Sequence, residues 1–96
     1  MAVATFVTAY SSREVDRQAV PPVMRITAEY ITEDPSIPDA ELGDARVTFL
    51  LSDTPADQVR KIKLAVYDDI QNHITRPDLL PAVVNGIPTV RVPSIA

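Results

Sequence analysis

The stretch from Arg46 to Ile74 constrains the fold of this chain more than any other part of the sequence. Its first part, Arg46–Ser52, is the most apolar run, and helical periodicity follows directly after Thr54. A continuous apolar run is typical of a strand covered on both faces, whereas apolar residues spaced three and four apart are typical of an amphipathic helix. We therefore expect a central buried strand, a tight turn, and a helix that folds back over a sheet.

The start of this helix is encoded by Thr54, whose side chain can accept a hydrogen bond from the backbone N–H of Asp57. Pro55 takes the first helical position, where its missing N–H costs nothing. Asp57 and Lys61 stand four residues apart, a spacing that favours an ion pair. The helix is expected to end at Arg76-Pro77, because the residue before a proline is pushed out of the helical region. The buried face is expected to consist of Val59, Ile62, Val66, Ile70 and Ile74, with His73 beside them.

The outer face of the same helix has two features that a simple covering helix does not need. Leu64 falls on the solvent side, and Tyr67 falls at the edge of the apolar stripe. Basic residues occupy the first half of the helix, where the helix dipole disfavours positive charge. Ordinary surface variation explains both features, and so does a contact between this face and another protein chain.

Two earlier segments have the alternation of strands. Val3–Tyr10 alternates loosely, and Val23–Thr32 alternates strictly between apolar and polar side chains. The strict alternation predicts an inward face made of Met24, Ile26, Ala28 and Tyr30. We expect Ser11–Gln18 to be a loop, although Ser12 could also begin a short helix. We expect Glu33–Asp44 to be a second, acidic loop, whose carboxylates suggest calcium but lack the spacing of an EF-hand.

The end of the sequence predicts a β-hairpin. Asn85-Gly86 stands between apolar residues, and both residues tolerate the positive φ angles of a type I′ turn. The second strand, Ile87–Val92, is expected to be an edge or to start irregularly, because Pro88 cannot donate a ladder hydrogen bond. The element order is then β-β-β-α-β-β. This order predicts an α+β fold with a mostly antiparallel sheet and one amphipathic helix packed on it.

Length and composition limit the class of protein. Its 96 residues make one domain, 1–96, for which 1–22 is a candidate extended N-terminal arm and 93–96 a candidate tail. The chain has no cysteine, so no disulfide or thiolate metal site is expected. A net charge of −4 argues against non-specific nucleic-acid binding. The sequence has no good signal peptide and no run long enough to cross a membrane, so we expect a cytoplasmic protein or a component of a virion assembled there.

The sequence contains no catalytic or ligand-binding constellation that stands above background. His73 is the only histidine and lacks a nucleophile in a known sequence context, so we expect it to pack or cap. Asp68-Asp69 could act on a metal or a proton, but adjacent helical residues point about 100° apart and do not converge on one ion. Arg13, Arg17 and Arg25 could form a small basic patch, for which surface ion pairs are the simpler explanation. We predict no catalytic, cofactor-binding or metal-binding residue and no cofactor, and we expect a protein that is not an enzyme.

Two function classes remain. The first is a structural or assembly protein that associates with itself, and a small virion component of a tailed phage (capsid decoration, head–tail joining or tail protein) is the expected setting. The second is a small dimeric binding or regulatory module, either antitoxin-like or ligand-sensing. In both classes the partners are copies of the chain or another protein, and neither nucleic acid nor membrane. The residues expected to contact the partner are the apolar chain ends, Val3, Phe6, Val7, Val92 and Ile95, and the outer helix residues, Leu64 and Tyr67.

Overall fold

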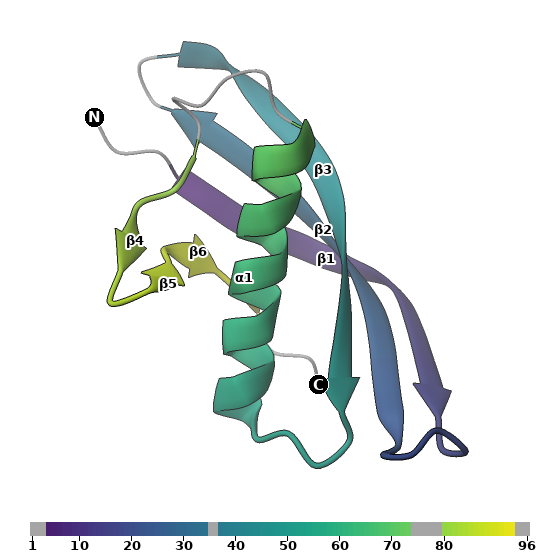
Figure 1. Cartoon of the computed structure of the whole chain (residues 1–96). Helices are drawn as coiled ribbons and strands as arrows, with labels where there is room; N and C mark the ends of the chain where they lie inside the picture. Colours follow the sequence, from purple (N-terminus) through teal and green to yellow (C-terminus); the bar gives the residue numbers. More distant parts are fainter. Residues whose placement is uncertain (1–3, 35–36, 74–79, 94–96) are drawn as a thin grey trace.

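The computed structural model describes residues 4–34, 37–73 and 80–93, apart from the side chains of residues 34, 37–41 and 73. Three long strands are followed by one helix and three short strands (Figure 1). Their bounds are β1 Ala4–Asp16, β2 Val23–Asp34, β3 Ile37–Leu50, α1 Pro55–His73, β4 Val83–Val84, β5 Ile87–Pro88 and β6 Val90–Arg91. This arrangement confirms the predicted α+β class.

The main sheet has four strands in the order β3-β2-β1-β6. The pairs β1–β2 and β2–β3 are antiparallel, whereas β6 runs parallel to β1 and pairs with it only at Thr5 and Phe6. Strands β4 and β5 form a separate two-stranded hairpin. Helix α1 crosses one face of the main sheet, which is called the inner face below, and the opposite face is called the outer face (Figure 1).

The core lies between α1 and the inner face. The expected helical stripe is confirmed at Ile62, Val66 and Ile70, each of which is 0% exposed, while Val59 is only partly buried. Ile74 lies outside the described residues. The inward face predicted for Val23–Thr32 is confirmed as well, because Ile26, Ala28 and Tyr30 are buried and Met24 packs against them. The other buried residues of the core are Val7, Ala45, Val47, Phe49 and Val90.

Three expectations about the long strands were wrong. Most of Ser11–Gln18, which was expected to be a loop or a short helix, is strand. Strand β1 continues to Asp16, through two register shifts in its pairing with β2. Most of Glu33–Asp44 is strand, because β3 begins at Ile37 and pairs with β2 along a long hairpin. Proline and acidic residues suggested a loop locally, but pairing with a neighbouring strand outweighs local propensity. Of the carboxylates that suggested a calcium site, only those of Glu33 and Asp44 belong to the described side chains. The others lie outside the description.

The third error concerns Arg46–Ser52, which is not a central strand covered on both faces. Its residues 46–50 belong to β3, which ends at Leu50 and lies at the edge of the sheet. Its side chains alternate, with Val47 and Phe49 buried and with Arg46 and Thr48 exposed on the outer face. The strand is covered on one face only.

The helix start is as predicted. The hydroxyl of Thr54 accepts the backbone N–H of Asp57 at 3.2 Å, and the Thr54 carbonyl accepts the N–H of Gln58 at 3.0 Å. Lys61, however, forms its ion pair with Asp53 at 2.5 Å rather than with Asp57. The Asp53 carboxylate also accepts the N–H of Leu50 at 3.0 Å, so it ties the end of β3 to the helix.

The predicted hairpin turn is confirmed by the backbone angles. Asn85 has φ 54° and Gly86 has φ 77°, as a type I′ turn requires. Beyond it, the expected strand Ile87–Val92 is divided into β5 and β6 at Thr89. The backbone N–H and the hydroxyl of Thr89 both donate to the carbonyl of Ala82, at 2.8 and 2.9 Å, and close the base of the hairpin.

Candidate binding surfaces

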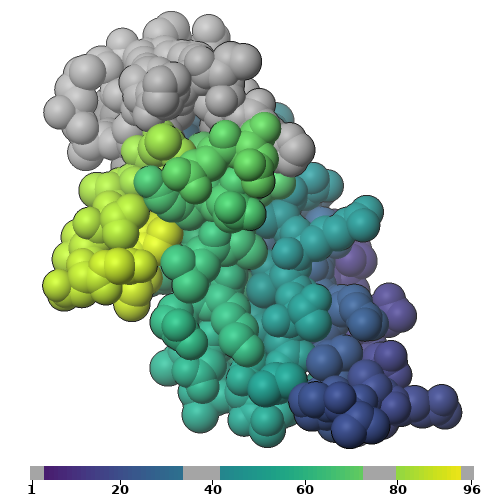
Figure 2. Space-filling view, in the orientation of Figure 1, coloured from purple at the N-terminus to yellow at the C-terminus, as the bar shows by residue number. Residues whose placement is uncertain are grey.

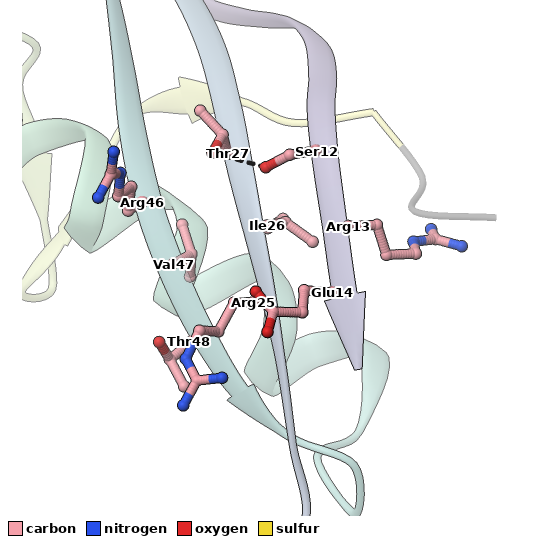
Figure 3. A pocket seen from close by; sticks show the side chains of 9 residues that line it. All are labelled: Ser12, Arg13, Glu14, Arg25, Ile26, Thr27, Arg46, Val47 and Thr48. Carbon is pink, nitrogen blue, oxygen red and sulfur yellow. Dashed lines mark hydrogen bonds between the residues drawn. The ribbon is translucent and has the colours of Figure 1, made fainter. Parts of the chain in front are cut away.

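The outer face carries a shallow depression of about 350 Å³ across β1, β2 and β3 (Figure 3). Hydroxyl and charged side chains line it, and the Ser12 hydroxyl donates to Thr27 at 2.8 Å. Arg13 points away from the other lining side chains in Figure 3. The lining residues are Ser12, Arg13, Glu14, Arg25, Ile26, Thr27, Arg46, Val47 and Thr48.

The basic patch expected from the sequence is therefore brought together only in part. Arg25 lines the depression on the outer face, whereas the Arg13 side chain, opposite the inward-facing Ile26, points away from the other lining side chains (Figure 3). Arg17 is an exposed residue that follows the end of β1. Arg46 joins Arg25 from β3. Sequence reasoning missed Arg46 because it placed this strand in the middle of the sheet. The alternation of Arg46 and Thr48 with Val47 and Phe49 was the signal that could have shown an exposed face.

The remaining candidates from the sequence have structural partners or lie outside the description. The Asp69 carboxylate accepts a hydrogen bond from the hydroxyl of Tyr30, and Asp68 accepts one from Asn72 at 3.5 Å. The two aspartates thus serve different contacts, as the helical geometry predicts. The side chain of His73 lies outside the described residues. Within the described residues, no group of three or more His, Cys, Asp or Glu side chains could hold a metal ion.

The chain ends expected to meet a partner divide between the two faces. Val7 is 5% exposed and belongs to the core, and Val92 packs against that core. Phe6 instead belongs to the outer face, where the guanidinium of Arg91 lies 5.9 Å from its ring centre. The hydroxyl of Tyr10 donates to the carbonyl of Pro93 at 2.9 Å, and burial raises the pKa of this tyrosine. Val3 and Ile95 lie outside the described residues.

An apolar row crosses the outer face next to the charged residues. Phe6, Ile31 and Leu42 are aligned across three strands by the register of the sheet. Phe6 and Ile31 are half-buried, whereas Leu42, on β3, is 78% exposed. A large apolar side chain that is this exposed at a sheet edge is well placed to contact another chain.

A second, mostly apolar groove of about 410 Å³ lies between α1 and the β4–β5 hairpin, which stand side by side in Figure 2. Its lining residues are Pro55, Ala56, Val59, Arg60, Lys63 and Ile87. The hairpin also exposes Val83 and Val84 by 48% and 56%. As expected, Leu64 lies on the solvent side of the helix, where it is 40% exposed, and Tyr67 is half-buried at the edge of the helix stripe. The contact of these two residues with a partner stays a prediction.

The edges of the main sheet differ from each other. Strand β1 has β6 beside it only at Thr5 and Phe6, and its remaining edge is interrupted by two register shifts, Val7/Ala9 and Tyr10/Ser12. Among the described strands, β3 pairs with β2 alone, and it follows β2 without a shift from Glu41 to Leu50. Bulges are a common way to stop an edge strand from pairing with another chain, and the long edge of β3 has none in this region.

Comparisons with known proteins add nothing to this picture, because no family model, no curated protein and no solved structure matches the chain. None of the helices in the described residues is long and apolar enough to cross a membrane.

Proposed function

We propose that this chain is a non-enzymatic structural or assembly protein that associates with copies of itself through the free edge of β3. The observation that carries the proposal is the regular course of residues 41–50 of β3, which follow a sheet edge without a register shift and expose the outer side chain of Leu42. An edge strand presents unpaired backbone N–H and C=O groups, which form hydrogen bonds with any strand of matching direction. Association would satisfy these groups and cover Leu42.

We propose that the chain associates in this way as a small virion component of a tailed phage. That part of the proposal is supported by the sequence alone, through the apolar chain ends and the lack of a catalytic constellation. Light scattering during size-exclusion chromatography tests the association itself. The full chain should give a mass above that of one copy at high concentration, and Leu42→Lys should shift the mass towards that of the monomer, because a lysine at a strand edge opposes pairing.

Val20→Lys is the matched control for this experiment. Val20 is 99% exposed but lies in the connection between β1 and β2, away from the β3 edge. The control should keep the mass of the unmodified chain. A monomer at every concentration, or an equal effect of the two lysines, would contradict the proposal.

The alternative, a small binding or regulatory module, is favoured by one specific observation. The groove between α1 and the hairpin is apolar, and the hairpin beside it exposes Val83 and Val84. Under this alternative Ile87→Asp would abolish binding of the partner, while Leu42→Lys would leave binding intact. The two substitutions therefore distinguish the two functions.

A further inference from the structure

The charges along the free edge of β3 are arranged so that they match a second copy of the same strand. Asp44 and Arg46 are two residues apart and both are exposed on the outer face. Figure 3 shows the Arg46 side chain on the side of β3 away from β2. Neither residue forms an ion pair or a side-chain hydrogen bond within the part of the chain that the structure describes.

The position of Asp44 is unfavourable within one copy. Asp44 lies directly opposite Glu29 on the neighbouring strand β2, and both side chains are exposed on the outer face. Two like charges directly opposite each other destabilise a sheet. A positive charge placed on the other side of Asp44, beyond the free edge, would relieve this repulsion.

A two-fold axis through Ala45 supplies that charge. In an antiparallel pair of β3 strands related by this axis, Ala45 faces its own copy, and Asp44 of each chain faces Arg46 of the other. Shifting the axis by one residue in either direction sets Asp44 against Asp44 or Arg46 against Arg46. The register centred on Ala45 is the one that gives two cross-strand pairs of opposite charge.

The rest of the strand fits the same register. Leu42 of one copy faces Thr48 of the other, so the exposed leucine meets the methyl group of a β-branched residue. The pairing extends over residues 40–50 of each strand, and Pro38, which cannot donate a hydrogen bond, falls outside it. The helix of each copy lies on the inner face of the sheet (Figure 1), and the outer side chains of this register, Leu42, Asp44, Arg46 and Thr48, are all exposed.

We propose that two copies of this chain join edge to edge through β3, antiparallel and centred on Ala45, into one continuous sheet. This inference rests on the proposed self-association and specifies its partner, its symmetry and its register.

Charge reversal tests the register. Asp44→Arg and Arg46→Asp each place like charges opposite each other in both of the cross-strand pairs between position 44 of one copy and position 46 of the other. Each substitution should therefore weaken the dimer by about tenfold or more. The chain with both substitutions restores opposite charges and should associate within about threefold of the unmodified chain. Arg17→Asp reverses an exposed charge beyond the end of β1, outside the proposed interface, and should leave the dimer unchanged.

Cross-linking tests the register independently of affinity, because the chain has no cysteine of its own. A mixture of Leu42→Cys and Thr48→Cys chains should form a disulfide between the two variants under mild oxidation, since directly opposed residues have Cα atoms within disulfide range. Either variant alone should cross-link much less. Both substituted side chains are exposed, so folding should be retained.

The outcomes separate the two claims. A dimer that is indifferent to both charge reversals, or that cross-links Leu42→Cys chains to each other as well as to Thr48→Cys chains, overturns the register while self-association stands. A chain that remains monomeric at all concentrations overturns both.

Discussion

The hydroxyl of Tyr30, on β2, donates a hydrogen bond to the carboxylate of Asp69 on α1 at 2.5 Å. The same hydroxyl passes so close to Gly43 of β3 that a Cβ atom at position 43 would lie 2.5 Å from it. The Tyr30 side chain thus extends from β2 across β3 to α1, and it passes over Gly43, which has no side chain to block it. This contact anchors the second half of α1 and explains why an acidic residue is found there although the helix dipole disfavours it.

Gly43→Ala should therefore destabilise the fold. The added Cβ would collide with the buried ring of Tyr30, and the ring could move only by giving up its contact with Asp69. We expect a loss of about 1–3 kcal/mol in the free energy of unfolding, measured by urea denaturation, which exceeds the small entropic gain of replacing glycine. Tyr30→Phe in the same background removes the hydroxyl but keeps the ring, so it should not restore the lost stability. If Gly43→Ala is neutral, the close approach of Tyr30 is not a constraint.

The helix core gives the second prediction. Ile62 and Val66 are both 0% exposed, so Ile62→Ala and Val66→Ala should each cost on the order of 2–4 kcal/mol through lost burial and the cavity left behind. Leu64→Ala, on the outer face of the same helix, should cost less than about 1 kcal/mol. Equal urea midpoints for Ile62→Ala and Leu64→Ala would contradict the packing of α1.

The third prediction concerns acid stability. The ammonium group of Lys61 lowers the pKa of Asp53 below its ordinary value, with help from the backbone N–H of Leu50. Since the folded state has the lower pKa, this contribution to stability is complete above the ordinary pKa and is lost as the pH falls through the folded value. Asp53→Asn should flatten the decline of the urea midpoint between about pH 5 and pH 2.

Lys61→Met is the companion variant for that experiment. It removes the largest cause of the lowered pKa but keeps the carboxylate and its hydrogen bond to Leu50. The midpoint of Lys61→Met should depend on pH less steeply than that of the unmodified chain. An unchanged pH dependence in both variants would show that the ion pair does not stabilise the folded state.

The hairpin turn gives the fourth prediction. Gly86 has φ 77°, and no atom outside its chain neighbours would lie within 4 Å of an added Cβ, so any cost of a side chain there comes from the backbone alone. Gly86→Val should disorder the hairpin, at a cost of about 1–2 kcal/mol, because a β-branched residue resists positive φ. The amide signals of residues 83–87 would report this in NMR spectra. Retained cross-strand contacts between Val84 and Ile87 would show that the turn tolerates the substitution.

Sequence reasoning predicted the elements whose causes are local. The cap at Thr54, the periodicity from Ile62 to Ile70, and the Asn85-Gly86 turn all depend on residues within a few positions of one another, and the structure confirms each of them. The strict alternation of β2 also depends on near neighbours. These signals survive because tertiary contacts reinforce them.

The errors arose where distant pairing decides the structure. The composition of 33–44 favours a loop, but β2 offers a complete row of hydrogen-bonding partners, and β3 extends along it. The ion pair of Lys61 with Asp53 spans eight residues across the helix start, outside the spacing rules for helices. The edge position of β3, on which the candidate site depends, follows from the order of the strands and cannot be obtained from the residues of β3 alone.

Hydrogen–deuterium exchange of the β3 amides, measured on the full chain at a low and a high concentration, tests the central claim most directly. Within the described residues of one copy, the amides of β3 that point away from β2 have no strand partner. We predict that roughly half of the amides in residues 42–50 exchange fast in dilute solution and become protected at high concentration, because the second copy accepts their hydrogen bonds. The edge amides of β1 should be unaffected. Equal exchange of the β3 amides at both concentrations would contradict assembly through this edge.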